Sequence, residues 1–415
     1  MVKLNEEEQA MLAGEFGEPR RLSIEHIQKV GNFFDAEDLV EVSQVHLMAD
    51  TESTGEAGIE YLEMLGTYPE EERRVRVPTV TDPLGCDFAK AERINHPEEF
   101  IALERRLTNA FLDLGILITQ TCINYQTILP PVLGEHLAYG DTGSSIYANS
   151  VMGGRTNFQG GPSALAAALT GRVPRYGFHL DERRRGTNLW ELQCRPESLS
   201  DWGAAGAIIG RAQGSYWEVP VITGVDGSPN SDELKQFGAA MASFGSTPLF
   251  HMVGVTPEAP DLASVFDGPP PAATPLSQAD IDDLYRSYQP DDDKLDVVVF
   301  AAPQLSLVEM QQVGLLLRDR NVHADVTVLA ATSPEIKAAC DRMGITEMIE
   351  ASGAVVLEGV CFYQMHAREI GEANGWRRLM SNSAKIVNIL GGYGYEPVLG
   401  TTEHCIDSAV AGRIV

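Results

Sequence analysis

Two cysteines of this chain follow apolar segments and precede aromatic residues, a setting in which a thiol can take part in chemistry. Cys122 comes after the apolar stretch 114–118, and Cys361 comes after Gly359 and Val360. Neither belongs to a C-x-x-C pair, so local spacing gives no metal-binding signature. A thiolate ligates metals or attacks electrophiles, whereas a buried thiol behaves as a small apolar side chain. The sequence alone leaves metal ligation, catalysis and simple burial open.

Four further residues carry side chains that can transfer protons or bind anions. Glu135 and His136 are adjacent, and histidine titrates near neutral pH, so this pair is a candidate for acid–base catalysis. Lys385 lies in a cluster of Ser and Asn residues, where its ammonium group can hold an anion or donate a proton. Arg155 offers a guanidinium fork that matches a carboxylate. A structural histidine and a solvent-exposed lysine are the alternatives.

The residues around these candidates predict alternating helices and strands. Apolar residues at helical spacing predict helices over residues 23–34, 56–65 and 98–114, and residues 75–80 predict a strand. Residues 134–171 are rich in Gly, Ser, Thr and Asn, a composition that suits close approach of the backbone to a ligand. The chain has no P-loop, dinucleotide-binding, HExxH or GxSxG motif.

The last third of the chain predicts a parallel sheet. Strands at 295–300, 325–329 and 354–360 alternate with helices, and this βαβαβ order implies parallel pairing. Ligands of such sheets bind beyond the carboxyl ends of the strands. Residues 301–304 and Cys361 follow two of these strands, so both are candidate positions for a site.

A chain of 415 residues exceeds one ordinary domain of about 100–200 residues, so more than one folding unit is expected. The Pro- and Ala-rich stretch 256–279 is typical of a linker. We therefore predict a main body over residues 1–255, a linker over 256–279, and a C-terminal α/β lobe over 280–415.

The chain is strongly acidic. Its 31 Lys and Arg residues against 59 Asp and Glu residues give a formal net charge of −28. Such a surface repels phosphate backbones and anionic lipid, which disfavours nucleic-acid and membrane-surface partners. No apolar run approaches the ~20 residues that span a bilayer, and the acidic N-terminus is unlike a signal peptide, so we expect a cytoplasmic protein. In that reducing compartment the six cysteines are not expected to form a disulfide framework.

Several short motifs together resemble the large subunit of the aconitase X family. The resemblance covers nearly the whole chain, and its most specific part is the stretch 149–165. The segments that carry it are 55–60 (GEAGIE), 77–79 (VPT), 82–83 (DP), 121–125 (TCINY), 134–136 (GEH), 148–157 (ANSVMGGRTN), 160–165 (GGPSAL), 176–181 (YGFHLD), 381–385 (SNSAK) and 404–405 (HC).

The resemblance implies an aconitase-like α/β/α architecture of several domains, with parallel or mixed sheets and a separate C-terminal α/β lobe. It also implies a hydro-lyase that dehydrates a small β-hydroxy carboxylate such as mevalonate 5-phosphate or cis-3-hydroxy-L-proline. A large subunit of this kind works with a separate small swivelling subunit, so a heterodimer is expected.

The resemblance further implies an iron–sulfur cluster on three cysteines. Cys122 matches the first ligand and Cys361 the third, so both are candidate metal ligands. The second ligand should stand in a Gly-Cys-Pro-His-like stretch, and here Ala302 occupies that position. Alanine cannot ligate iron. A cluster completed by a non-protein or oxygen ligand, a single metal ion on two thiols, and loss of the cluster are therefore open.

The resemblance also implies roles for polar residues. The substrate-contacting positions are Asp82, Pro83, Thr142, Ser144 and Lys385. Lys385 is expected to bind a carboxylate or protonate the leaving group, while Thr142 and Ser144 hydrogen-bond the substrate. Residues expected to shape the site are Asn149, Ser150 and Arg155, and the candidate bases are Glu135 and His136.

Three positions depart from the family pattern, and they keep other functions open. Besides Ala302, Asp82 stands where the family has asparagine, and Asn124 stands where it has proline. The latter two adjoin the expected pocket, so the substrate can differ from both known ones. The alternatives to a dehydratase are a metal-independent isomerase or epimerase of a small carboxylate and a non-catalytic ligand-binding paralogue.

Overall fold

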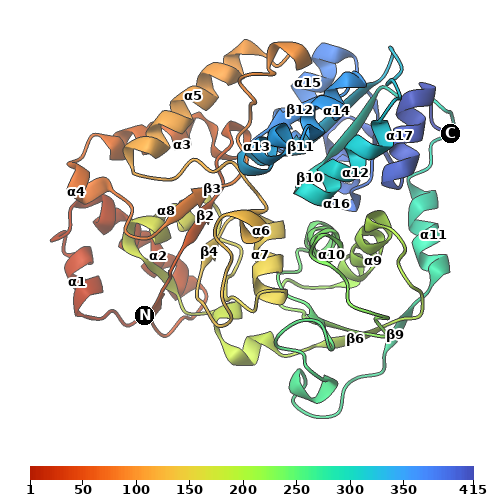
Figure 1. Cartoon of the computed structure of the whole chain (residues 1–415). Coiled ribbons are helices and arrows are strands. Elements are labelled where there is room, and N and C mark those ends of the chain that lie inside the picture. Colours follow the sequence, from red (N-terminus) through yellow and green to blue (C-terminus); the bar gives the residue numbers. More distant parts are fainter.

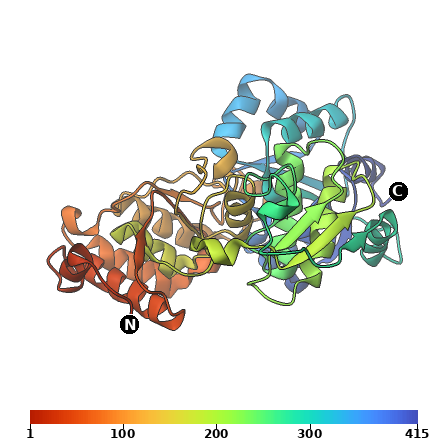
Figure 2. The same cartoon turned by 90° about the horizontal axis from the view of Figure 1, so that it is seen from below.

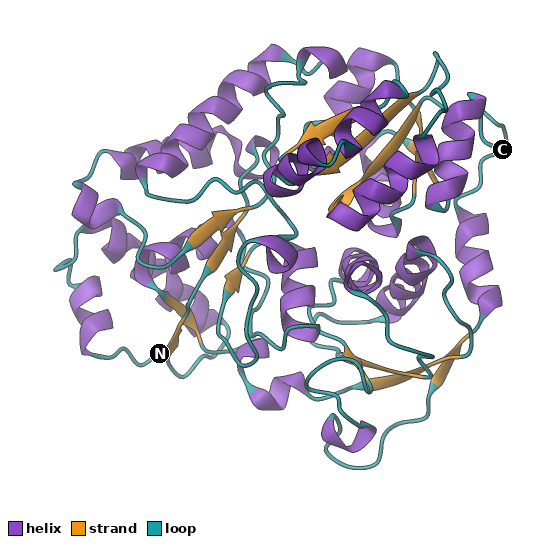
Figure 3. Cartoon of the chain, viewed as in Figure 1, coloured by secondary structure: helices purple, strands orange, loops and turns teal.

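The computed structural model describes residues 1–415, and it consists of three units in which helices pack against sheets (Figures 1 and 3). The sheets have three, four and five strands, all paired in parallel, and a separate pair of short strands is antiparallel. The predicted α/β class with parallel or mixed sheets is therefore confirmed. None of the helices has the length and apolar character needed to span a membrane.

The first unit is built around a parallel sheet of order β3-β2-β4. Apolar residues of α3, α5 and α8 share one core with this sheet, which explains the helical periodicity seen in the sequence. Its helices are α1 (Glu6–Leu12), α2 (Glu18–Phe33), α3 (Thr51–Gly66), α4 (Glu70–Arg73), α5 (Glu98–Asp113), α6 (Asn124–Thr127), α7 (Thr142–Ser150) and α8 (Gly161–Thr170). Its strands are β1 (Leu39–Glu41), β2 (Val45–Leu47), β3 (Thr79–Thr81), β4 (Ala138–Tyr139) and β5 (Arg172–Pro174).

The second unit has a parallel sheet of order β8-β7-β6-β9. Its strands are β6 (Asn188–Leu192), β7 (Pro220–Thr223), β8 (His251–Met252) and β9 (Thr274–Leu276), and its helices are α9 (Leu199–Ala212), α10 (Ser231–Gly245) and α11 (Gln278–Ser287). Helices α9 and α10 approach so closely that a Cβ atom on Gly206 would lie 2.1 Å from the carbonyl oxygen of Phe237. Glycine is required there because any side chain would separate the two helices.

The stretch 256–279, which we expected to link two lobes, is largely folded into this second unit. Its last residues form β9, which pairs with β6, and Ala259 and Val265 are buried in a small core with Leu189 and Val221. Proline and alanine are compatible with an edge strand, because an edge strand leaves one row of backbone groups unpaired. Composition alone therefore did not distinguish a linker from an edge of a sheet.

The third unit has a five-stranded parallel sheet of order β12-β11-β10-β13-β14. The βαβαβ pattern predicted the parallel pairing and three of these strands, β10, β11 and β12. Ser306 and Glu309 form the capping box that begins α12. The strands are β10 (Val297–Leu305), β11 (Thr327–Thr332), β12 (Val355–Glu358), β13 (Arg378–Ser381) and β14 (Glu396–Leu399). The helices are α12 (Leu307–Leu317), α13 (Pro334–Arg342), α14 (Ile345–Ala351), α15 (Ala367–Asn374), α16 (Ala384–Leu390) and α17 (Thr402–Ala411).

The three units meet along one continuous interior. Seen from below (Figure 2), the first unit forms one side of the molecule and the other two lie together on the opposite side. The largest apolar core draws residues from all three units. A backbone bridge also joins the first unit to the third, since Leu84 N–H donates to the carbonyl of Gly359 at 2.9 Å. Segments near residues 84, 122 and 360 are thereby held together.

Candidate active site

Three buried carboxyl groups gather at one edge of the first sheet. Asp50 follows β2, Asp82 follows β3 and Asp141 follows β4. Because the three strands are parallel, their carboxyl ends meet at the same edge. Gln364 of the third unit donates its amide to Asp82 Oδ2 at 2.7 Å and to Asp50 Oδ2 at 3.2 Å. The third unit therefore closes over this edge.

Lys385 reaches the same edge from the third unit. It lies in the first turn of α16, directly after β13, and the Ser383 side chain caps that helix. Its Nζ atom lies 3.3 Å from Asp141 Oδ1 and 5.5 Å from the centre of the Tyr363 ring. With 4% of its surface exposed, Lys385 is not a solvated charge on a helix. The site thus lies where the carboxyl ends of strands from two parallel sheets meet.

Asp82 and Asp141 are both fully buried but ionise differently. Burial opposes ionisation of Asp141, yet the Lys385 ammonium and the Ser144 N–H, 2.7 Å from Oδ2, lower its pKa overall. Asp82 is not paired with a lysine or arginine, so burial and then the Asp141 charge raise its pKa well above the usual value. Its Oδ1 lies 3.6 Å from His46 Nε2 and has no hydrogen-bond partner. Asp141 therefore ionises more readily, whereas Asp82 holds its proton more strongly.

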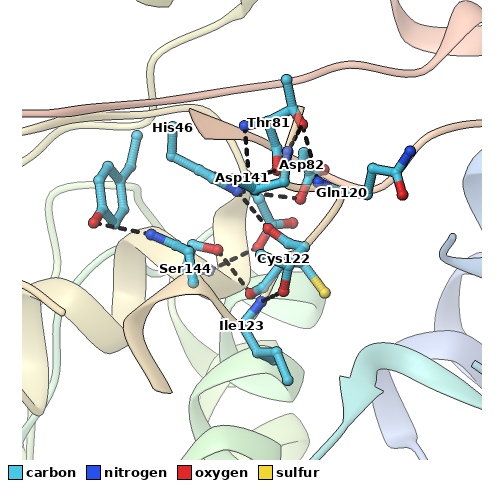
Figure 4. A network of polar contacts seen from close by, with 12 residues as sticks. His46, Thr81, Asp82, Gln120, Cys122, Ile123, Asp141 and Ser144 are labelled. Carbon is cyan, nitrogen blue, oxygen red and sulfur yellow. Dashed lines mark hydrogen bonds and ion pairs between the residues drawn. The ribbon is translucent and has the colours of Figure 1, made fainter. Parts of the chain in front are cut away.

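Cys122 and Cys361 lie beside these carboxyl groups. The loop before Cys122 is held against β3, because Thr81 Oγ1 accepts the N–H groups of Thr119 at 2.9 Å and Gln120 at 3.0 Å (Figure 4). Both thiols are buried. The neighbouring Cys361 thiol, followed by burial, raises the pKa of Cys122 well above its usual range. These surroundings favour a neutral thiol at position 122.

The Gly/Ser-rich segment delivers helix α7 to the site. Asp141 is the N-cap of this helix, which explains why an acidic residue precedes the Thr-Gly-Ser sequence. Ser144 Oγ donates to the carbonyl of Cys122 at 2.9 Å, and Thr142 is half-buried in the first turn. The same helix thereby positions the ionised carboxylate and one cysteine loop (Figure 4).

The three units match, in order, the first, second and third domains of aconitase X, over residues 1–182, 186–286 and 295–411. The phosphomevalonate dehydratase large subunit of Methanothermobacter thermautotrophicus is 35% identical over 396 residues, which make up 94% of each chain. The chain belongs to the aconitase X family.

Two further relatives agree with this membership. The cis-3-hydroxy-L-proline dehydratase of Pseudomonas aeruginosa is 31% identical over 417 residues, covering 99% of this chain and 70% of the relative. The crystal structure of Thermococcus kodakaraensis aconitase X in its holo form superposes with a TM-score of 0.86 at 28% identity, covering 98% of this chain and all of the other. The aconitase-like architecture implied by the motifs is thereby confirmed.

The side chains present do not fit the three-cysteine cluster that the family resemblance implies. Cys122 and Cys361 are adjacent, but the side chain at position 302 is a buried methyl group. No three His, Cys, Asp or Glu side chains of the chain are arranged so that they could hold a metal ion. Iron–sulfur clusters depend on thiolate ligands, and two thiols supply one ligand too few for the implied set.

Five other residues with an expected role lie outside this cluster of acids and thiols. Glu135 accepts the N–H of Val132 at 2.7 Å, and His136 Nδ1 lies 2.9 Å from His179 Nδ1. The Arg155 guanidinium pairs with Asp181. The Asn149 side chain donates to the carbonyls of Thr156 and Pro248, and Ser150 Oγ accepts the N–H of Phe250. No hydrogen bond or ion pair joins any of the five to Lys385, Asp82 or the cysteines.

The sequence analysis missed four polar residues of the site: His46, Asp50, Asp141 and Gln364. Asp50 and Asp141 carried a local signal, since each precedes a helix start as an N-cap does. His46 lies inside a buried strand, and Gln364 gains its role from contacts with Asp50 and Asp82, which are more than 280 residues away. Pro83, which was expected at the substrate, directly follows Asp82 and is buried.

A buried acid next to the site leads to a prediction about stability. Glu104 of α5 accepts the N–H of Thr51 at 3.1 Å, and burial raises its pKa to about 7. Its proton stabilises the fold fully below its ordinary pKa, and this contribution is lost as the pH rises to about 7. Glutamine does not titrate, so we expect Glu104→Gln to lose less stability than the parent as the pH rises. This effect should amount to about 3 kcal/mol in the free energy of unfolding at pH 8. Urea unfolding at pH 5 and pH 8 measures the free energy of unfolding of both proteins. If it changed equally with pH in the variant and the parent, the assignment would be contradicted.

Proposed function

We propose that this protein is a hydro-lyase that removes water from a small β-hydroxy carboxylate, as the large subunit of a two-subunit enzyme. The observation that carries the proposal is the buried Lys385–Asp141 pair beside Asp82, whose Oδ1 has no hydrogen-bond partner. A buried cation, a carboxylate and a carboxylic acid in one cluster are the three groups that elimination next to a carboxylate requires.

The roles follow from charge. The Lys385 ammonium attracts the substrate carboxylate and stabilises the negative charge that develops on it when the adjacent carbon loses a proton. Asp141, kept ionised by Lys385, accepts that proton. The C–H electrons form the double bond, the C–O bond breaks, and the Asp82 proton joins the departing hydroxide to give water. We assign the base to Asp141 because Glu135 and His136 form no hydrogen bond or ion pair with the cluster.

The names of the relatives suggest substrates and a partner. Several relatives are named phosphomevalonate dehydratase large subunits, a name that implies a small partner, and another is named cis-3-hydroxy-L-proline dehydratase. We infer that a separate small, swivelling subunit completes the enzyme and that a small hydroxy acid enters the crevice. The cytoplasmic location stays a prediction.

Product analysis with the two named hydroxy acids tests this function. The chain, alone and with a small subunit from a relative, is incubated with mevalonate 5-phosphate or cis-3-hydroxy-L-proline, and loss of 18 mass units is followed by mass spectrometry. Dehydration that Lys385→Met abolishes supports the proposal. Turnover that is unchanged in Lys385→Met, or none with any β-hydroxy acid tried, contradicts it.

A second candidate is proton transfer without loss of water, as in an isomerase or epimerase. One observation favours it: Ala302 replaces the second of the three expected cysteine ligands, so the protein lacks part of the donor set implied for the dehydratases. The same acid–carboxylate pair suffices to exchange a proton next to a carboxylate. Deuterium uptake from heavy water into recovered hydroxy acid, with no dehydrated product, distinguishes this reaction from elimination.

A further inference from the structure

Gln304 is buried at the end of β10, two residues after Ala302, and its side chain contacts both cysteine-bearing segments. Its Nε2 donates to the carbonyl of Gln120 at 3.0 Å and to that of Val360 at 3.2 Å. These carbonyls stand two residues before Cys122 and one before Cys361. Both are pure acceptors, so the NH₂ end of the amide must face them. One side chain therefore joins the two loops that carry the thiols.

The backbone of Gln304 is fixed at the same time. Its N–H lies 3.3 Å from Cys122 Sγ, and its carbonyl accepts from Lys235 Nζ at 3.2 Å. Lys235 belongs to α10 of the second unit, is fully buried, and forms ion pairs with Asp232 and Glu309. A buried ion pair that also satisfies a carbonyl resists displacement, because breaking it leaves uncompensated charge. All three units thus hold Gln304 in place.

A three-thiolate cluster would join three chain segments through the metal, and Ala302 removes one of those links. We propose that Gln304 is a positioning residue that holds the Cys122 and Cys361 segments together in place of the missing metal ligand. The crevice is then assembled by hydrogen bonds within the protein. This role concerns the architecture of the site and is independent of which reaction it catalyses.

Native-state thiol labelling tests the proposal. In a Cys194→Ser background, which removes the half-exposed thiol, the remaining cysteines are buried. Gln304→Leu should raise the labelling rates of Cys122 and Cys361 about tenfold or more, because the buried carbonyls that the side-chain amide bonds, those of Gln120 and Val360 among them, lose their donor. Cys340 and Cys405, in the outer helices of the third unit, should keep their rates. Peptide mapping by mass spectrometry assigns each rate.

The matched control is Gln236→Leu, which removes a buried amide from the same interface between units but touches neither cysteine segment. It should leave the labelling of Cys122 and Cys361 unchanged. If the leucine variant is insoluble, Gln304→Met replaces it in the labelling experiment, because methionine has nearly the same volume as glutamine. Equal acceleration of all thiols, or none, overturns the proposal. So does stoichiometric binding of iron and sulfide by the unmutated protein after anaerobic reconstitution, because a cluster would then hold the segments.

Discussion

Replacing Lys385 with methionine is expected to lower kcat/KM at least about 1,000-fold for whichever hydroxy acid is turned over, which corresponds to about 4 kcal/mol of transition-state stabilisation. The ammonium is buried beside Asp141, and this carboxylate, together with the nearby thiols and Asp82, raises the pKa of Lys385 against the opposing effect of burial. Removal of the cation leaves the site without a positive charge to meet a substrate carboxylate. Steady-state kinetics of purified variant and parent measure the effect.

The matched control is Lys90→Met. Lys90 also links two units through an ion pair, to Glu350 at 2.6 Å, but it is partly exposed and forms no ion pair with Asp50, Asp82 or Asp141. Partly exposed pairs contribute about 0–1 kcal/mol to stability, so this variant should fold and turn over normally. If Lys385→Met retained activity within tenfold of the parent while remaining folded, the ammonium would have no part in the chemistry.

The first three strands of the third unit, and the helices α12 and α13 between them, could be predicted because their signals are local. The capping box at Ser306 and Glu309 and the β-branched run of β10 determine a helix and a buried strand whatever lies elsewhere in the chain. The stretch 256–279 failed as a linker because pairing of β9 with β6 depends on a strand more than 80 residues away. Propensity does not report such pairing.

The candidate site could be predicted in part, and the reason is again the range of the contacts. Cys122 and Cys361 were singled out by residue type and by position after apolar segments, and Lys385 by its place in a cluster of Ser and Asn residues. The Lys385–Asp141 pair spans 244 residues, so neither partner reveals the other in the sequence. Glu135 and His136 look like a catalytic pair because they are adjacent, yet adjacency in the chain does not bring two side chains to the same site.

Asp82→Asn is expected to separate catalysis from stability. If Asp82 supplies the proton for the leaving hydroxide, loss of this acid should lower kcat at least about 100-fold, the usual contribution of general acid–base catalysis. The amide keeps the shape of the side chain, and the family resemblance has asparagine at this position, so the fold should accept it. Measurement of kcat at saturating substrate and of the free energy of unfolding distinguishes the two effects.

The stability of Asp82→Asn should rise relative to the parent as the pH increases. Burial and the Asp141 charge raise the pKa of Asp82 in the folded state, so the folded protein holds a proton that the unfolded chain releases near pH 4. The stabilisation by this proton is complete below that pH and is lost as the pH rises through the raised pKa. Asparagine does not titrate, so the gap between variant and parent should widen from pH 5 to pH 8.

Asp50→Asn is the matched control for this prediction. Asp50 is also buried, shares the amide of Gln364, and has a pKa raised by burial to about 6. It acts as the N-cap of α3, where asparagine caps nearly as well as aspartate. Its replacement should shift stability with pH but leave kcat nearly unchanged. Equal losses of kcat in the two variants would assign the effect to the electrostatics of the crevice as a whole and remove the specific role of Asp82 as the acid.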